Sequence, residues 1–483
     1  VNDRNTVFAS GYFGRDVFGA GFKFNWGNST ATVRWNHIFN SKLFMNLSTF
    51  YSNYQYNLGF SDAGTGQAFD WTSNIINYSL KPDFTYYLNS KNTIKFGAQA
   101  ILFTFKPGDA SITATDGSKS KILLDNQYGT EYALYIDNEQ KLAPRLTLQY
   151  GIRWSMFNYL GKGTKYNYRD TIPNESKPFE SEEKFSNGKI IKSYNNPEPR
   201  LAVNYTINDK SSIKLGYNRM SQYLHIVSNT AASTPLDIYT PVTNNVKPLI
   251  SDQVTLGYFR NFKDNMFETS AEVYYKDLQN QLDYVDNADL LLNKYLEADL
   301  IQGKGRAYGF ELYLKKAKGK LNGWVSYTLS KTERQVNGLS NNDWFLSKYD
   351  RTHNINTVLI YDLNKRLSFS GNFVFMTGTP ATFPNVKVEL QGYNIPYNTQ
   401  GTRNNYRNTP YHRADIGITY NFKKNDHRRY KQTVVLSVYN LYNRRNAFSI
   451  YFRQGINDPT INEAVRYSVV GSIIPAITYN FKF

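Results

Sequence analysis

Hydrophobic and polar residues alternate along much of this chain, so that every second side chain is apolar. In residues 94–100 (IKFGAQA), an isoleucine, a phenylalanine and two alanines alternate with lysine, glycine and glutamine, and residues 146–155 (LTLQYGIRWS) repeat the pattern. A period of two places the apolar side chains on one face of an extended strand, whereas a helix needs a period of 3.6. The pattern therefore predicts a chain of strands, each with one apolar and one polar face.

The last residues, 468–483 (SVVGSIIPAITYNFKF), show the same alternation and end on an aromatic residue. An unprotected edge strand of this kind invites pairing with another chain, whereas a closed barrel in a membrane has no such edge. The ending resembles the C-terminal strand by which outer-membrane β-barrels are recognised and inserted. Tyr479, Phe481 and Phe483 are therefore the candidate barrel-assembly signal. A core strand that finishes a soluble sheet is the alternative.

The connections between the segments alternate between tight turns and long polar loops. The tight turn at residues 208–211 (NDKS), for example, is followed by a loop at about 221–249. A soluble sandwich or propeller also has many short strands, but neither explains this alternation. In outer-membrane barrels, the periplasmic turns are short and the extracellular loops are long. The sequence predicts an all-β fold, a transmembrane antiparallel up-and-down β-barrel with about eighteen strands, most of them near the ten residues that a tilted transmembrane strand needs.

Two segments carry more specific expectations. The first strand is expected near residues 6–14, followed by a longer loop through Trp26 and Ser29, and residues 284–300 (YVDNADLLLNKYLEADL) are candidates for a short helix within a loop. If the tight turns are periplasmic, both ends of the chain lie on the periplasmic side, and an even number of strands is expected before Val1. Four further strands would give the 22 strands of the large plugged transporters. Residues 1–483 are thus interpreted as the C-terminal part of a barrel, with an N-terminal plug domain and the first strands not covered.

The composition fits a membrane barrel. Aromatic residues make up 16% of the chain, with 40 Tyr and 31 Phe, and such residues suit the boundary between lipid and water. No run near eighteen apolar residues occurs, which excludes a helical membrane span. The absence of Cys excludes disulfides, thiolate metal sites and cysteine nucleophiles.

The net charge of +17 permits an anionic partner but does not specify one. The basic residues are scattered through turns, such as residues 315–320 and 428–431, which indicates solvated turns. No recognition helix or zinc-finger spacing accompanies them, so the sequence gives little support for nucleic-acid binding.

Several stretches resemble the β-barrel of TonB-dependent outer-membrane receptors, particularly the Tyr- and Asn-rich kind found in Bacteroidetes-type bacteria. The matching stretches are residues 5–18 (NTVFASGYFGRDVF), 306–331 (RAYGFELYLKKAKGKLNGWVSYTLSK), 349–361 (YDRTHNINTVLIY), 375–380 (FMTGTP), 413–422 (RADIGITYNF), 436–446 (LSVYNLYNRRN) and the closing ITYNFKF. The individual motifs are loose, but their order and spacing are specific.

This resemblance implies an importer in the outer membrane of a Gram-negative bacterium, energised by the inner-membrane proton-motive force. It implies outer-membrane lipid, the barrel assembly machinery and the TonB complex as partners, the last through an N-terminal region outside these residues. A surface lipoprotein is a further candidate partner. The substrate class stays open between a siderophore or other metal chelate, a glycan and a peptide.

Three other functions stay open at this point. A passive porin has a similar strand pattern, with fewer strands and an open lumen. An envelope enzyme built on a barrel needs a Ser/His/Asp-type arrangement on one rim, and a receptor barrel can also serve as a fixed subunit of a larger envelope complex.

Candidate chemistry is sparse, and we predict no catalytic, cofactor-binding or metal-ligating residues. The five histidines, at positions 37, 225, 353, 412 and 427, lack metal-ligand spacing and are interpreted as surface or turn residues. Asp350 and Arg351 are expected to form an ion pair at a strand start. The acidic residues at positions 283, 286 and 289 offer a calcium site, but a solvated acidic loop is the preferred interpretation.

Polar residues divide between the lumen and the outer loops. We expect an inward face from Lys95, Gln99, Gln149, Arg153, Lys214, Asn218 and Glu311. A substrate is expected to meet the long outer loops first, where Tyr393, Tyr397, Arg403, Asn404, Tyr406 and Arg407 offer stacking and hydrogen bonds.

Overall fold

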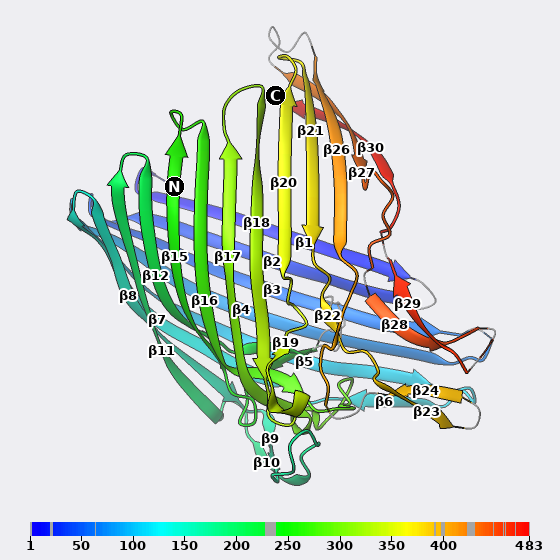
Figure 1. Cartoon of the computed structure of the whole chain (residues 1–483). Helices are drawn as coiled ribbons and strands as arrows, with labels where there is room; N and C mark the ends of the chain where they lie inside the picture. The colour runs from blue at the N-terminus through cyan, green and yellow to red at the C-terminus, as the bar shows by residue number, and fades with distance from the viewer. Residues whose placement is uncertain are drawn as a thin grey trace.

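The dominant element of the computed structural model is one antiparallel sheet of twenty strands, curved into a wall (Figure 1). The structure describes residues 2–19, 23–62, 64–227, 238–390, 393–397, 401–422, 430–447, 449–456, 458, 460–468 and 470–482. Eighteen of the twenty strands, all except the short β6 and β19, follow one another as a continuous antiparallel ladder. The predicted fold class and strand number are therefore confirmed.

The wall strands, in chain order, are β1 (Asn5–Gly19), β2 (Lys23–Ile38), β3 (Leu43–Ser61), β4 (Ala68–Asn89), β5 (Asn92–Thr113), β7 (Gln127–Ala143), β8 (Leu146–Leu160), β11 (Ile190–Asn208), β12 (Ser211–Gln222), β15 (Leu249–Phe262), β16 (Phe267–Tyr284), β17 (Leu300–Lys316), β18 (Leu321–Gln335), β20 (His353–Asp362), β21 (Leu367–Met376), β26 (Tyr411–Asn421), β27 (Lys431–Tyr439) and β30 (Ile474–Lys482).

The remaining elements lie in the longer connections. They are β6 (Lys119–Leu123), β9 (Gly163–Tyr168), β10 (Phe179–Phe185), β13 (Leu224–Val227), β14 (Ile238–Pro241), β19 (Phe345–Leu346), β22 (Pro380–Ala381), β23 (Val386–Leu390), β24 (Tyr393–Tyr397), β25 (Tyr406–Arg407), β28 (Ser449–Gln454), β29 (Asn462–Tyr467) and the 3₁₀ turns η1 (Leu296–Ala298) and η2 (Ser340–Asn342). No helix in the described part of the chain is long and apolar enough to cross a bilayer.

The ladder has two edges. Within the described residues, β1 pairs only with β2 and β30 pairs only with β27. Ile477, Tyr479 and Phe481 lie on β30 with their side chains exposed, whereas Phe483, the third residue of the candidate assembly signal, lies outside the described residues.

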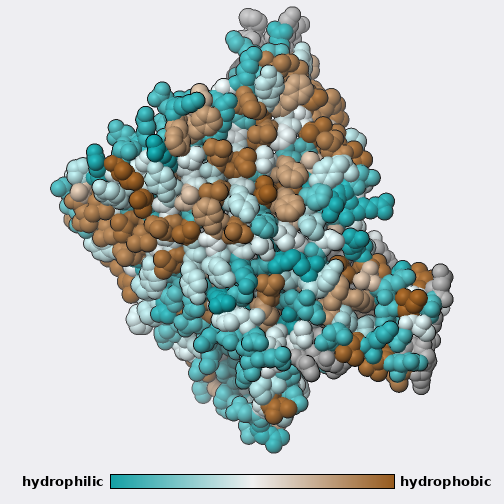
Figure 2. All heavy atoms as spheres, in the orientation of Figure 1, coloured by the Kyte–Doolittle hydropathy of each residue, from teal (hydrophilic) through white to brown (hydrophobic). Residues whose placement is uncertain are grey.

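The outer face of the wall carries the predicted apolar side chains. Leu215 on β12, Leu256 on β15 and Val273 on β16 are cross-strand neighbours in one row, and each is 45–47% exposed. Figure 2 shows such brown side chains gathered over the strands of the upper half, whereas the lower half, which bears the long loops, is mostly teal. An apolar band flanked by polar ends is the outer surface that a lipid bilayer requires.

The predicted alternation of connections holds, but the first strands are longer than expected. Trp26 and Ser29 lie in β2, where they pair with Asp16 and Phe13 of β1, and not in a loop. The ladder continues here because the alternation of side chains extends beyond the membrane boundary. Phe24 and Trp26, two residues apart, stack on the same face of β2 with their ring centroids 5.0 Å apart.

The short helix considered for residues 284–300 is wrong except for the single 3₁₀ turn η1. Asn287 and Leu292 have left-handed φ angles of 58° and 52°, which interrupt a helix. Leu290 and Leu300 are buried in a loop cluster with Val227, Ile238, Val246 and Leu282. Tertiary packing of these leucines therefore overrides the local helix propensity.

The apolar band predicts a position-dependent cost for a buried charge. We expect Leu256→Arg to destabilise the barrel in lipid vesicles by about 2–4 kcal/mol, because the arginine would face the hydrocarbon near the bilayer midplane. The matched control is Leu390→Arg on β23, a leucine that is also exposed but lies in a loop hairpin. Free energies of unfolding measured by guanidinium titration in vesicles test this, and equal costs at the two sites would contradict the lipid-facing assignment of β15.

Candidate functional site

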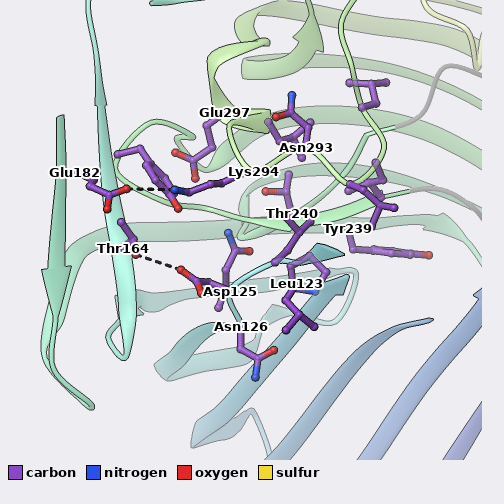
Figure 3. A pocket seen from close by; sticks show the side chains of 18 of the residues that line it. Leu123, Asp125, Asn126, Thr164, Glu182, Tyr239, Thr240, Asn293, Lys294 and Glu297 are labelled. Carbon is purple, nitrogen blue, oxygen red and sulfur yellow. Dashed lines mark hydrogen bonds and ion pairs between the residues drawn. The ribbon is translucent and has the colours of Figure 1, made fainter. Parts of the chain in front are cut away.

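A cavity of about 390 Å³ lies among the long connections at the lower end of the wall (Figure 3). Its lining comes from segments far apart in sequence: the ends of β4, β5 and β8, residues 123–127, the β9–β10 hairpin, β14 and residues 290–297. A volume of this size is in the range of sites for small molecules. The cavity is therefore the candidate binding site of this chain.

One side of the cavity is aromatic and apolar. Trp71 is buried, donates its indole N–H to the Pro107 carbonyl at 3.3 Å and meets the Tyr56 ring edge-on at 5.3 Å. Phe24 and Ala110 complete this buried cluster, against which Leu292 packs. The cluster fixes the Trp71 ring because the indole has both a hydrogen-bond partner and packing neighbours.

Another part of the lining carries charged groups, several of which are labelled in Figure 3. The Glu182 carboxylate lies 3.5 Å from Lys294 Nζ and 4.0 Å from Lys184 Nζ. Asp125 accepts a hydrogen bond from the Thr164 hydroxyl at 3.3 Å. The Lys294 ammonium also lies 5.7 Å from the centre of the Tyr166 ring, within reach of a cation–π interaction.

Glu297 is the most deeply placed carboxyl of the lining. Burial raises its pKa, an effect opposed by hydrogen bonds from Asn245 and Thr243 and by the nearby Lys177 ammonium. Burial lowers the pKa of Lys177, whose Nζ donates to the Leu300 carbonyl at 3.1 Å. A buried carboxyl held by amide and hydroxyl donors can accept hydrogen bonds from a ligand without a large change in hydration.

Polar residues also connect strands of the inner wall. Arg153 on β8 donates to Gln99 on β5 at 2.9 Å and lies 3.4 Å from Glu131 on β7 and 3.6 Å from Glu198 on β11. Its neighbour Trp154 is 53% exposed on the opposite face. Four strands are thus bridged by groups that alternation predicts to point inward.

The other residues expected to point inward have varied surroundings. Gln149 donates to Asp137 at 3.4 Å, and Lys214 Nζ lies 4.4 Å from the centre of the Phe259 ring. Lys95, Asn218 and Glu311 lie on β5, β12 and β17. None of these residues lines the cavity.

Of the outer-loop residues expected to meet a substrate, Arg403, Asn404, Tyr406 and Arg407 do not line the cavity either. Arg403 pairs with Asp286 and donates to the Tyr284 carbonyl at 2.7 Å, and Arg407 pairs with the buried Asp350 at 2.6 Å. Asn404 donates to the Leu346 carbonyl at 2.7 Å. These side chains fasten loops to one another.

The expected tyrosines divide between two short strands. Tyr406 stacks on Phe383 with ring centroids 4.0 Å apart. Tyr393 and Tyr397 lie in β24, and their side chains are outside the described part of the structure.

Two expectations about charged loop residues are corrected. Asp350 pairs with Arg407 and not with Arg351, whose guanidinium instead donates to the Thr377 carbonyl at 3.2 Å. Asp283 is not solvated: it is 8% exposed and lies 3.1 Å from Arg334. These carboxylates have guanidinium partners, and no group of His, Asp or Glu suited to hold a metal ion is found in the described ranges.

The histidines have separate partners. His37, His353 and His412 make side-chain contacts with Asn5, Tyr327 and Tyr442 at 2.8, 3.0 and 2.8 Å. The surface or turn interpretation is wrong for His225, which is buried in β13 with its Nε2 3.2 Å from the Lys247 carbonyl. His427 lies outside the described residues.

A comparison with known protein families shows to which family this sheet belongs. The family described as TonB dependent receptor-like, beta-barrel matches residues 1–441, which is most of the chain. The chain belongs to this family. As a TonB-dependent receptor barrel, it is an outer-membrane protein of Gram-negative bacteria, and its family comprises transporters and not enzymes.

Solved structures show the same fold at low sequence identity. The unliganded ferric citrate transporter FecA has a TM-score of 0.65 at 13% identity and is matched by 100% of this chain over 68% of its own. The copper transporter OprC has a TM-score of 0.64 at 11% identity, with 99% and 69% covered. The ferric-catecholate import receptor Fiu from E. coli K12, in its closed form, has a TM-score of 0.59 at 14% identity, with 96% and 65% covered.

This chain therefore spans about two thirds of the length of these receptors. No functionally curated protein matches the sequence.

The buried ion pair between Arg407 and Asp350 predicts a local loss of stability on mutation. We expect Arg407→Met to destabilise the connections on either side of β20 and β21 by about 3–5 kcal/mol, because Asp350 is fully buried and would lose its guanidinium partner. Amide exchange of residues 345–352 and 377–390, followed by mass spectrometry, should accelerate at least a hundredfold. The matched control is Arg453→Met, which removes an exposed pair with Glu463 worth at most about 1 kcal/mol. Unchanged exchange in the Arg407 variant would refute the fastening role.

The buried His225 predicts a pH-dependent loop. Burial lowers its pKa from 6.5 to about 4, so the folded β13–β14 hairpin keeps the imidazole neutral where the unfolded loop binds a proton. The hairpin should have its full stability above pH 6.5 and lose roughly 3 kcal/mol as the pH falls to about 4. Exchange rates of residues 224–227 and 238–241, corrected for intrinsic pH dependence, measure this. The His225→Gln variant keeps a hydrogen-bond donor but does not titrate, so its hairpin stability should not depend on pH in this range. An equal pH dependence of hairpin stability in both proteins would contradict the prediction.

Proposed function

We propose that the full-length protein is a TonB-dependent receptor that imports a scarce nutrient into the periplasm with energy from the inner-membrane proton-motive force. The observation that carries the proposal is the cavity of about 390 Å³ built by the loops of a barrel that belongs to this family. An importer needs a selective binding site at the loop end of the barrel, whereas a nonselective pore does not need one.

The substrate is proposed from three classes: a siderophore or other metal chelate, a glycan, or a peptide. The similar structures are a ferric citrate transporter, a copper transporter and a ferric-catecholate import receptor, which supports the first class by analogy of fold alone.

The remaining parts of the proposal concern the whole protein. We propose that a plug domain and four strands precede residue 1, that the TonB complex acts through that region, and that the protein is of the Bacteroidetes type. The exposed edges β1 and β30 suit further strands between them. Tyr479, Phe481 and Phe483 are proposed as the signal for the barrel assembly machinery, and a surface lipoprotein is proposed as a further partner.

Energised import predicts dependence on the proton gradient. Deletion of the gene should reduce accumulation of the nutrient at least tenfold under limitation, and a protonophore should reduce uptake in the complemented strain to the same level. Mass spectrometry of small molecules that co-purify with the receptor identifies the nutrient to be followed.

The control is a general porin of the same cells, whose solute uptake is not driven by the gradient. Uptake through this protein that survives the protonophore, together with open-channel conductance in planar bilayers, would favour a passive porin instead.

A further inference from the structure

The cavity is close to electrically neutral although the chain is strongly basic. Its lining contains the carboxylates of Asp125, Glu182 and Glu297 and the ammonium groups of Lys184 and Lys294. The chain as a whole carries +17. The excess of positive charge is therefore located elsewhere, and the cavity lining itself carries slightly more acidic than basic groups.

The two ammonium groups of the lining share one carboxylate. Lys294 and Lys184 lie 3.5 and 4.0 Å from Glu182. A ferric chelate of the citrate or catecholate kind carries several negative charges, and its binding requires cationic groups that replace its hydration. No arginine is found among the described residues that line the cavity, and arginine is the residue best suited to bidentate recognition of carboxylates. An anionic chelate would also approach the Asp125 carboxylate, whose hydrogen bond comes from the neutral Thr164 hydroxyl.

The rest of the lining suits hydroxyl groups. Amides of Asn126, Gln127 and Asn293 and the hydroxyls of Thr164 and Thr240 surround the same space. Amide and hydroxyl side chains both donate and accept, as the hydroxyl groups of a sugar do. A carboxylate adds strong acceptors for hydroxyl donors, because hydrogen bonds to a charged group are about twice as strong as neutral ones.

The aromatic side of the cavity supplies the complementary apolar surface. The half-buried rings of Tyr166 and Tyr239 contribute aromatic surface to the lining, whereas Trp71 and Tyr159 are only 2% and 3% exposed. Rigid aromatic rings offer a large contact area at little entropic cost. They can pack against the C–H faces of a pyranose ring while the hydroxyl groups at its rim reach the polar side.

We propose that this cavity binds an uncharged, hydroxyl-rich ligand such as a short oligosaccharide, and that it discriminates against anionic metal chelates. The inference rests on the proposed import function and names the substrate class of that same site. It differs from the substrates named for the structures of similar fold, which share the fold with this chain at only 13–14% sequence identity.

The first test is binding to the purified full-length receptor. Isothermal titration calorimetry at 150 mM NaCl compares the neutral trisaccharides maltotriose, cellotriose and xylotriose with ferric citrate and ferric enterobactin. We expect at least one trisaccharide to bind at least tenfold more tightly than either chelate. The inference is overturned if a chelate binds more tightly than every trisaccharide, or if no trisaccharide binds.

Two variants test the charge argument directly. Glu182→Gln leaves Lys184 and Lys294 without their shared carboxylate, so the ratio of chelate affinity to trisaccharide affinity should rise at least tenfold. Asp125→Leu removes a charged acceptor and should weaken trisaccharide binding at least tenfold. The matched control is Glu180→Gln, which changes a residue of the same hairpin outside the lining and should leave both affinities unchanged. Heat-modifiable migration in gels confirms that each variant is folded, and an unchanged affinity ratio in the folded Glu182 variant would refute the inference.

Uptake assays in cells separate this inference from the proposed function. Gradient-dependent uptake of a ferric chelate through the receptor, with no uptake of any trisaccharide, would overturn the ligand class and leave the import function standing. Trisaccharide binding without any gradient-dependent uptake would support the ligand class and overturn the import function.

Discussion

The constraint on which this structure depends is that no backbone N–H or C=O group can remain unpaired in hydrocarbon. The chain meets it with a ladder in which each wall strand between β1 and β30 has an antiparallel neighbour on both sides. Because the backbone polar groups are hydrogen-bonded within the ladder, the outer face needs no further polar partners. Apolar side chains there make the surface compatible with lipid. The row of Leu215, Leu256 and Val273 is exposed for this reason, and would be unexpected on the surface of a soluble sheet.

The apolar residues of the wall face lipid, so the wall does not enclose a conventional hydrophobic core. Much of the buried apolar packing is therefore found in the connections and at the strand ends. Clusters around Leu290, Trp71, Phe157 and Leu339 lie in or beside the long loops. These clusters, together with ion pairs such as Arg403 with Asp286, hold the connections in defined positions. The candidate binding cavity depends on this second layer of packing, because its lining comes from loops and strand ends rather than from the middle of the wall.

The sequence predicted the wall well and the loops poorly, and the reason is the range of the interactions. A period of two is a local property, so the outward positions of Ile152 and Trp154 and the inward position of Arg153 could be inferred from a few neighbouring residues. The contacts of Arg403 cannot, because Asp286 is 117 residues away in the chain. No local pattern marks Asp125, Glu182 or Glu297 as neighbours of one cavity, or His225 as buried. The absence of the helix considered for residues 284–300 has the same origin, since Leu290 packs against Val227 and Ile238, which are remote in sequence. The length of β2 has a local origin, because its alternation continues beyond Ser29 toward Lys23 and it pairs with the adjacent strand β1.

The fastening of the loops links parts of the receptor that are far apart in sequence. Asp286, in the connection after β16, meets Arg403 from the connection after β21 and accepts from Asn174 of the β9–β10 hairpin at 2.9 Å. The backbone N–H of Arg403 in turn donates to Ser340, in the connection after β18, at 3.2 Å. An insertion or deletion in any one of these four segments would displace a bonded partner in at least one of the others. The lengths of these segments should consequently be correlated among relatives. Transplanting a single loop between receptors should disturb the arrangement of the loops more than exchanging all four together.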